Sequence, residues 1–161
     1  MTLYVLRHAI AEDPRPGRPD SSRQLTETGR NRCRRVLAHA KRVKVEPSYV
    51  LTSPYDRAAQ TAEIAREELG FDRELITTDA LIPFVGVQDL WNVVRDYAVG
   101  GDVMIVGHNP QLSMLVMWLL GARADALWLK KSGLVALDIG SAGPHPRAEL
   151  SWLLTPGSVG R

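Results

Sequence analysis

The sequence has very little cysteine and no long apolar run. Cys33 is the single cysteine of 161 residues, so no internal disulfide can form, which favours a reducing compartment. Because Cys33 lies between arginines in a helix-like stretch with no glycine-rich loop after it, we expect it to be structural. The longest apolar stretch, Leu112 to Gly121, is far shorter than the roughly 20 residues that span a bilayer. The first residues also lack the pattern of a signal peptide, and we therefore expect a soluble, cytoplasmic protein that does not bind membranes.

Several motifs are also missing, and each absence excludes a chemistry. None of the four histidines has a partner at the i, i+4 spacing of a zinc site, and no cysteine pair exists. There is no Walker-type loop and no dinucleotide fingerprint, and Ser53 does not lie in a Gly-x-Ser-x-Gly elbow. These absences argue against a resident metal, nucleotide-cofactor chemistry and a serine hydrolase.

Net charge is small, but the basic residues are unevenly distributed. Lysine and arginine number 20 against 18 acidic residues, and this balance of +2 gives no argument for nucleic acid as a partner. One segment nevertheless gathers seven basic residues: Arg30, Arg32, Arg34, Arg35, Lys41, Arg42 and Lys44. Such a cluster is typical of a solvated helix face, and a surface for an acidic partner is the functional alternative.

Strand-like and helix-like segments alternate along the chain. Buried strands are expected at 3–6, 49–51 and 102–106, with a weaker strand at 74–77. Helices are expected after a threonine cap at Thr26 or Thr28 to about Lys44, from about Pro54 to Gly70, around 90–97 and at 112–120. Runs 133–139 and 148–154, separated by a Gly-Pro-rich turn, predict an antiparallel strand pair, and 12–24 is expected to be a loop.

This order predicts one α/β domain over residues 1–161: a three-layer α/β/α sandwich with a central, mostly parallel sheet and an antiparallel C-terminal strand pair. In such sheets ligands bind beyond the carboxyl ends of the strands. Arg7 and His8 end the first strand, Ser53 to Arg57 follow the second, and His108 ends the strand at 102–106. We therefore expect these groups to meet at one edge of the sheet.

Two arginines and two histidines in one place suit a tetrahedral dianion. Arginine offers two parallel donors to phosphate oxygens and stays charged, while a neutral, oriented imidazole can attack phosphorus. The remaining cations then stabilise the transition state of phosphoryl transfer. A helix that begins near Asn109 and Pro110 also directs free backbone N–H groups toward such an anion. His39 and His145 receive no role.

These residues also carry a family resemblance. Leu6-Arg7-His8, the run Thr52-Ser53-Pro54-Tyr55-Asp56-Arg57-Ala58-Ala59-Gln60-Thr61-Ala62, and Val106-Gly107-His108-Asn109-Pro110 together resemble the histidine phosphatase (phosphoglycerate mutase-like) superfamily. The short length and Leu25-Thr26-x-x-Gly29 resemble its SixA-type phosphohistidine phosphatase branch.

The resemblance implies roles for individual residues. His8 matches the histidine that becomes phosphorylated, Arg7 and Arg57 match the arginines that hold phosphate, and His108 matches the second histidine. Arg23 lies where the SixA-type branch carries an arginine, and we count it with Asn109 among the candidate phosphate-binding residues. The family uses no metal and no organic cofactor.

The sequence departs from the wider superfamily in two places. Its Arg-His-Gly is Arg-His-Ala here, and Ala9 is expected to change the backbone of that turn only slightly. The acid that protonates the leaving oxygen in larger members has no clear match, and Glu12, Asp79 and Asp89 are candidates only by their position in the sequence. A site without an acid should favour phosphoramidates or aryl phosphates over alkyl esters, and the imidazole that leaves from phosphohistidine is a far better leaving group than an alkoxide.

The expected function is therefore that of a phosphatase acting on a phosphorylated protein through phospho-His8. Two alternatives stay open: a small-molecule phosphomonoesterase with the same site, and a phosphate- or phosphopeptide-binding module without turnover. The oligomeric state is left undetermined by the sequence.

Overall fold

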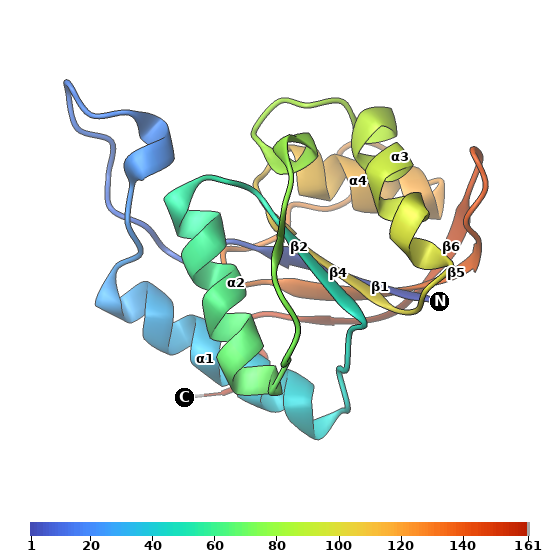
Figure 1. Ribbon diagram of the computed structural model, residues 1–161, viewed down its shortest axis with the longest axis horizontal. Coiled ribbons are helices and arrows are strands. Elements are labelled where there is room, and N and C mark those ends of the chain that lie inside the picture. The colour runs from blue at the N-terminus through green and yellow to red at the C-terminus, as the bar shows by residue number, and fades with distance from the viewer. Residues whose placement is uncertain (161) are drawn as a thin grey trace.

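Six strands form one mixed sheet in the order β3-β2-β4-β1-β5-β6, in a computed structural model that describes residues 1–160 (Figure 1). The strands are β1 (Thr2–Arg7), β2 (Tyr49–Thr52), β3 (Ile76–Thr77), β4 (Val103–Gly107), β5 (Leu134–Ser141) and β6 (Arg147–Leu154). The pairs of β1 with β4, β2 with β4 and β2 with β3 are parallel, whereas β5 is antiparallel to both β1 and β6. The predicted parallel centre and antiparallel C-terminal pair are confirmed.

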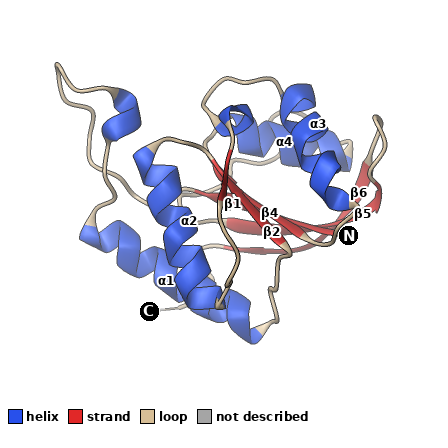
Figure 2. Cartoon of the chain, in the orientation of Figure 1, coloured by secondary structure: helices blue, strands red, loops and turns tan. Residues whose placement is uncertain are grey.

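Helices cover both faces of this sheet. The helices α1 (Glu27–Arg42) and α2 (Asp56–Leu69) pack on one face, and α3 (Val87–Ala98) and α4 (Gln111–Leu120) pack on the other (Figure 2). Each face of the sheet contributes alternate residues of the same strands, as with Leu6 toward α1 and α2 and Val5 toward α3 and α4. The three-layer prediction is therefore also confirmed. In the described part of the chain, no helix has the length and apolar character needed to cross a membrane.

Local sequence signals explain where α1 and α2 begin and end. The Thr26 side chain accepts a hydrogen bond from the backbone N–H of Gly29 and so caps α1. Gly70 takes a left-handed conformation, with φ of 73°, and ends α2. Gly29 is also needed for packing, because a Cβ at this position would collide with the backbone carbonyl of Ile10. Only glycine therefore lets α1 pack this closely on the segment after β1.

The segment predicted as a loop at 12–24 contains a feature that the sequence did not indicate. A short 3₁₀ helix, η1, spans Asp20–Ser22, and a second, η2, spans Asp79–Leu81. Three residues are too few to show any hydrophobic period, so such turns escape pattern analysis. The other elements agree with the predicted segments to within a few residues, apart from β3, which keeps only Ile76 and Thr77.

Strand direction decides what meets at the edge of the sheet. The strands β1, β2 and β4 are parallel, so their carboxyl ends lie at one edge, and β6 returns to that edge because it is antiparallel to β5. His8, Ser53 and His108 follow β1, β2 and β4 there. The segment that precedes β5 also lies at this edge, since the Ser132 N–H donates to the Arg7 carbonyl at 3.2 Å.

Candidate active site

His8 is almost completely buried and its ring is held in one orientation. Its side chain is 5% exposed, and its backbone N–H donates to the Gly107 carbonyl at 3.0 Å. Nδ1 lies 2.8 Å from the carbonyl oxygen of Ala9, which can only accept, so Nδ1 carries the proton. Nε2 consequently carries no proton, and it accepts a hydrogen bond from Nε of Arg57 at 3.4 Å. This is the tautomer that a nucleophilic imidazole needs.

The surroundings of His8 keep the ring neutral. Burial is the main cause that lowers the pKa of His8 to about 3, against an opposing contribution from the hydrogen bond to Ala9. The positive charges of Arg57, Arg7 and Lys131 lower the pKa further. A neutral ring with an unprotonated Nε2 is thus present at any physiological pH.

Arg57 connects His8 to a carboxylate, that of Asp20, which was not among the residues expected from the sequence. The guanidinium group is buried, and it donates from Nη1 to the Asp20 carbonyl at 2.8 Å and from Nη2 to Asp20 Oδ2 at 3.0 Å. Asp20 also pairs with Nε of Arg23 at 2.8 Å. Partial burial raises the pKa of Asp20, but the hydrogen bonds and charges of Arg57 and Arg23 outweigh this effect and hold the pKa below its ordinary value. Asp20 is therefore ionised at neutral pH.

Arg7 reaches the same place from the end of β1. Its Nη1 donates to the Leu129 carbonyl at 2.8 Å, while its buried Nε has no partner within the described residues. Burial lowers the pKa of Arg7, and the neighbouring charge of Arg57 lowers it further. Arg7 and Arg57 thus bring two positive charges to one place, where an anion would relieve their repulsion.

His108 lies against His8, with 5.1 Å between the ring centroids. Its Nε2 is 2.8 Å from Ser53 Oγ, and the same hydroxyl accepts the backbone N–H of Tyr55 at 3.2 Å. Ser53 accepts from Tyr55, and its own O–H is available to donate to Nε2 of His108; with that donation the proton of His108 is on Nδ1. That Nδ1 is buried and has no partner within residues 1–160. Burial, with the charges of His8 and Arg57 after it, lowers the pKa of His108 to about 3.

The two remaining candidates have other partners in this structure. Arg23 donates to Asp20 and, from Nη1, to the Glu12 carbonyl at 3.0 Å. The Asn109 amide donates to the Leu129 carbonyl at 2.9 Å, and its oxygen accepts from Ser113. Arg23 thus touches the site through Asp20, and Asn109 fixes the segment that Arg7 also contacts. Direct phosphate binding by either residue stays a prediction.

The candidate acids named from the sequence form no hydrogen bond with the residues of this cluster. Within residues 1–160, no carboxylate of Glu12, Asp79 or Asp89 is hydrogen-bonded to His8, Arg7, Arg57 or His108. Asp20 is in contact, yet its pairing with two arginines makes it a poor proton donor. The sequence signal that could have found Asp20 is its i, i+3 spacing from Arg23.

Together the side chains form a site for a tetrahedral anion beside a bare imidazole nitrogen. Arg57 donates to Nε2 of His8, the His108 ring lies beside the His8 ring, and Arg7 and His108 each keep a buried nitrogen without a partner in the described part of the chain. No group of three or more potential ligands for a metal occurs among the residues that the structure describes. An α/β fold with buried histidines and arginines at the carboxyl edge of its sheet is typical of proteins that act on phosphoryl groups.

Comparison with known proteins identifies the family. The sequence model of the histidine phosphatase superfamily (branch 1) matches residues 3–83. An uncharacterised protein from a Picosynechococcus strain is 33% identical over 160 residues, which is 97% of both chains. This chain therefore belongs to the histidine phosphatase superfamily, and the prediction of a phosphatase with a catalytic histidine is confirmed at that level.

Solved structures agree on the fold. The protein histidine phosphatase SixA, in complex with tungstate, superposes with a TM-score of 0.88 at 24% identity, over 99% of this chain and 100% of that one. A mycobacterial glucosyl-3-phosphoglycerate phosphatase superposes with a TM-score of 0.73 at 15% identity, over 94% of this chain and 97% of that one. The fold is thus that of the SixA-type branch, and it is shared with a phosphatase of a small phosphorylated molecule.

The two buried histidines predict a stability that depends on pH. Their folded pKa of about 3 lies below the ordinary value of 6.5, so between these values the unfolded chain binds more protons than the folded chain. We expect the free energy of unfolding to be flat above pH 6.5 and to fall by about 2 kcal/mol per histidine between pH 7 and pH 5. Urea denaturation at both pH values measures this change. A His8→Asn variant should lose about half of it, and an unchanged fall in that variant would contradict the assignment.

Proposed function

We propose that the protein is a phosphohistidine phosphatase that removes phosphoryl groups from a phosphorylated protein through phospho-His8. The roles assigned to His8, His108, Arg7 and Arg57 belong to this proposal. One observation carries it: the carboxylate that touches the site, Asp20, is ionised by its two arginine partners. The site therefore has a nucleophile and anion-binding groups but no placed proton donor in the described part of the chain.

The reaction has two steps in which the same nitrogen forms and breaks its bond to phosphorus. Nε2 of His8 attacks, a new N–P bond forms, and the bond from phosphorus to the substrate's nitrogen breaks. A phosphohistidine ring takes a proton from solvent on its free nitrogen near neutral pH, and so it leaves as neutral imidazole without an acid from the enzyme. Water then attacks phosphorus and the N–P bond to His8 breaks; inorganic phosphate leaves with the oxygen and both protons of the water as dihydrogen phosphate, and Nε2 of His8 is again unprotonated.

Charge on phosphorus is stabilised by groups that are already in position. The guanidinium groups of Arg7 and Arg57 and the Nδ1–H of His108 are suited to hold the non-bridging oxygens during both steps. In this proposal the Ser53 hydroxyl donates to Nε2 of His108 and so keeps the proton of that ring on Nδ1. His8 needs no base, since Nε2 is already bare.

Dependence on the leaving group tests the proposal. We expect kcat/KM for a series of aryl phosphates to fall steeply as the pKa of the phenol rises. Alkyl phosphates and phosphoserine should react at least about 100-fold more slowly than phosphohistidine, because a missing general acid costs roughly 10²–10⁴ in rate. The measurement is release of inorganic phosphate across the series and from a phosphohistidine-containing protein.

An Asp20→Asn variant is the matched control. If Asp20 donated a proton, its loss would slow the poor leaving groups most and steepen the dependence. We expect the slope to stay the same in this variant. If kcat/KM of the unaltered protein did not change with the pKa of the leaving group, the site would contain a general acid. That result would contradict the argument for phosphohistidine and make a small phosphomonoester the better substrate class.

A further inference from the structure

A basic groove lies next to the proposed active site and is unused by the reaction just described. It has a volume of about 620 Å³ and is lined by Arg7, Ile10, Arg32, Trp128, Lys130, Lys131, Ser132 and residues 155–157. The basic groove joins three parts of the chain that meet at the carboxyl edge of the sheet: helix α1, the segment before β5 and the turn after β6. Arg7 belongs both to this groove and to the proposed phosphate site.

The wall of the groove is held in place by the site itself. The carbonyl of Leu129, between Trp128 and Lys130, accepts hydrogen bonds from Arg7 at 2.8 Å and Asn109 at 2.9 Å. The Leu129 N–H donates to Ser113 at 2.9 Å, so both polar groups of this residue are fixed. The guanidinium of Arg7 lies 5.8 Å from the ring centroid of Trp128. A group bound in the groove would therefore be adjacent to a phosphoryl group on His8.

The charges in the groove are of one sign. Its described lining includes Arg7, Arg32, Lys130 and Lys131 and no carboxylate. Burial lowers the pKa of Lys131, and the charges of Arg7, Arg23 and Arg57 lower it further, with only Asp13 opposing them. Such a surface raises the local concentration of anions and speeds their association.

The shape of the groove favours a protein over a small molecule. Small ligands are enclosed for most of their surface, whereas Trp128 here is 59% exposed and Arg32, Lys130 and Lys131 lie on the outside. An exposed tryptophan beside arginines is typical of the energetically important centre of a protein interface. A second pocket, lined largely by residues of α2, differs from the basic groove in its charge. Its lining includes Glu63, Glu67 and Glu74 as well as arginines.

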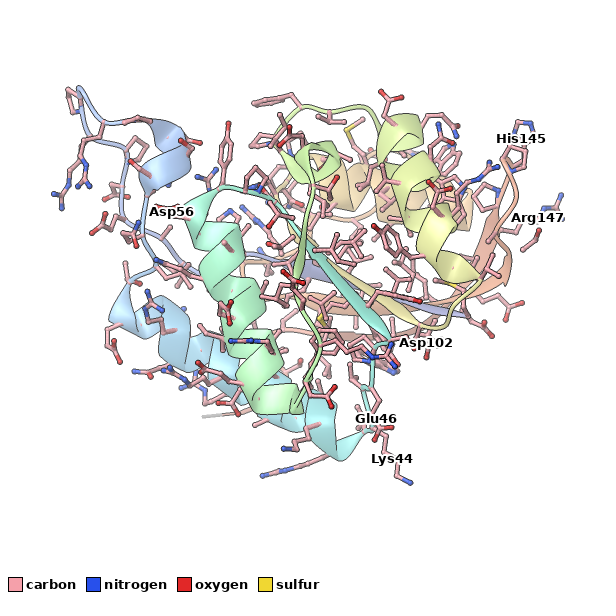
Figure 3. The ribbon with its side chains drawn as sticks, in the orientation of Figure 1. Lys44, Glu46, Asp56, Asp102, His145 and Arg147 are labelled. Atoms are coloured by element: carbon pink, nitrogen blue, oxygen red, sulfur yellow. The ribbon has the colours of Figure 1, made fainter. Side chains whose placement is uncertain are left out.

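We propose that the basic groove binds an acidic segment of the phosphorylated partner, with carboxylates close to the phosphohistidine in its sequence. The inference rests on the proposed function and specifies the substrate of the same site. The sequence left open whether the basic residues of α1 form a solvated face or bind an acidic partner. In this proposal only part of them binds the partner: Arg32 lines the groove, while Lys41 and Arg42 lie at the other end of the helix. Figure 3 labels Lys44 just beyond that end.

Two phosphohistidine peptides test this inference. One carries Glu and Asp on both sides of the phosphohistidine, and its twin carries Gln and Asn at the same positions. We expect kcat/KM to be roughly 30-fold higher for the acidic peptide at low salt, and the ratio to shrink as salt rises because the contacts are exposed. In an Arg32→Glu/Lys130→Glu variant the ratio should fall to within about 3-fold of unity.

Matched charge reversals separate docking from a general effect of charge. A Lys41→Glu/Arg42→Glu variant makes the same change on exposed residues of α1 outside the groove and should keep the ratio. Both variants should hydrolyse 4-nitrophenyl phosphate as the unaltered protein does, which also shows that they fold. Equal rates for the two peptides, or a ratio that survives in Arg32→Glu/Lys130→Glu, would overturn the docking role alone. Failure to hydrolyse either peptide would instead overturn the proposed function, and the docking role with it.

Discussion

Replacing His8 by alanine is expected to lower kcat/KM by roughly 10⁴-fold or more, since it removes the atom proposed to bond to phosphorus. No other side chain of the cluster is arranged to replace Nε2 of His8 as the attacking atom. In the tautomer of the proposal, the second imidazole of the cluster, His108, accepts from Ser53 at Nε2 and carries its proton on Nδ1, so it is not arranged to attack phosphorus. Water could reach phosphorus only directly, helped by the arginines alone. Phosphate release from a phosphohistidine protein, measured beside 4-nitrophenyl phosphate hydrolysis, gives the size of the loss.

A covalent intermediate is the second expected result of the same experiment. The unaltered protein, quenched during turnover of a radiolabelled phosphoprotein, should carry acid-labile phosphate, and His8→Ala should carry none. His145→Ala is the matched control, because His145 lies in the exposed turn between β5 and β6, far from the sheet edge that holds His8 (Figure 3). Phosphate release that continues at the normal rate without His8 would disprove the mechanism.

The sheet and the cluster could be predicted because their signals are local. Apolar runs mark β1, β2 and β4, and the polar residue that follows each strand is visible in the sequence. The rule that parallel strands place their carboxyl ends together then assembles His8, Arg57 and His108 without knowledge of any distance. Helix α1 could also be predicted, because Thr26 is a typical N-cap residue and the apolar residues Val36, Leu37 and Ala40 recur with helical spacing.

Contacts made by irregular segments could not be predicted in this way. Asp20 lies in a proline-rich stretch with no period, and its pairing with Arg57 depends on how that stretch folds over the edge of the sheet. Arg7 donates to the backbone carbonyl of Leu129. Every residue has such a carbonyl, so the type of residue at this position does not predict the contact. Orientation of side chains was equally hidden: the spacing placed Asn109 at the site but did not show that its amide faces Leu129.

Substitution of Arg57 has the second largest expected effect. Arg57→Ala should lower kcat by roughly 10³-fold, because it removes a charged donor from a buried position beside Nε2 of His8, where charge changes during transfer. Arg57→Lys should recover part of the rate, to a loss of roughly 10²-fold, since lysine keeps the charge but lacks the planar fork. Because these contacts strengthen in the transition state, kcat and kcat/KM should fall together, with little change in KM.

Arg66→Ala provides the control for this pair of variants. Arg66 is on the same helix as Arg57, is exposed, and forms an ordinary i, i+3 ion pair with Glu63 at 2.8 Å, so its loss should leave turnover unchanged.

An Asp20→Asn variant tests whether Asp20 only orients the guanidinium group of Arg57 or itself takes part in the reaction. If Asp20 only orients Arg57, its amide should slow turnover by much less than Arg57→Lys, because the Asp20 backbone carbonyl still accepts from Nη1. A loss in Asp20→Asn as large as that in Arg57→Ala would show that the carboxylate itself takes part in phosphoryl transfer, and the roles assigned at this site would have to change.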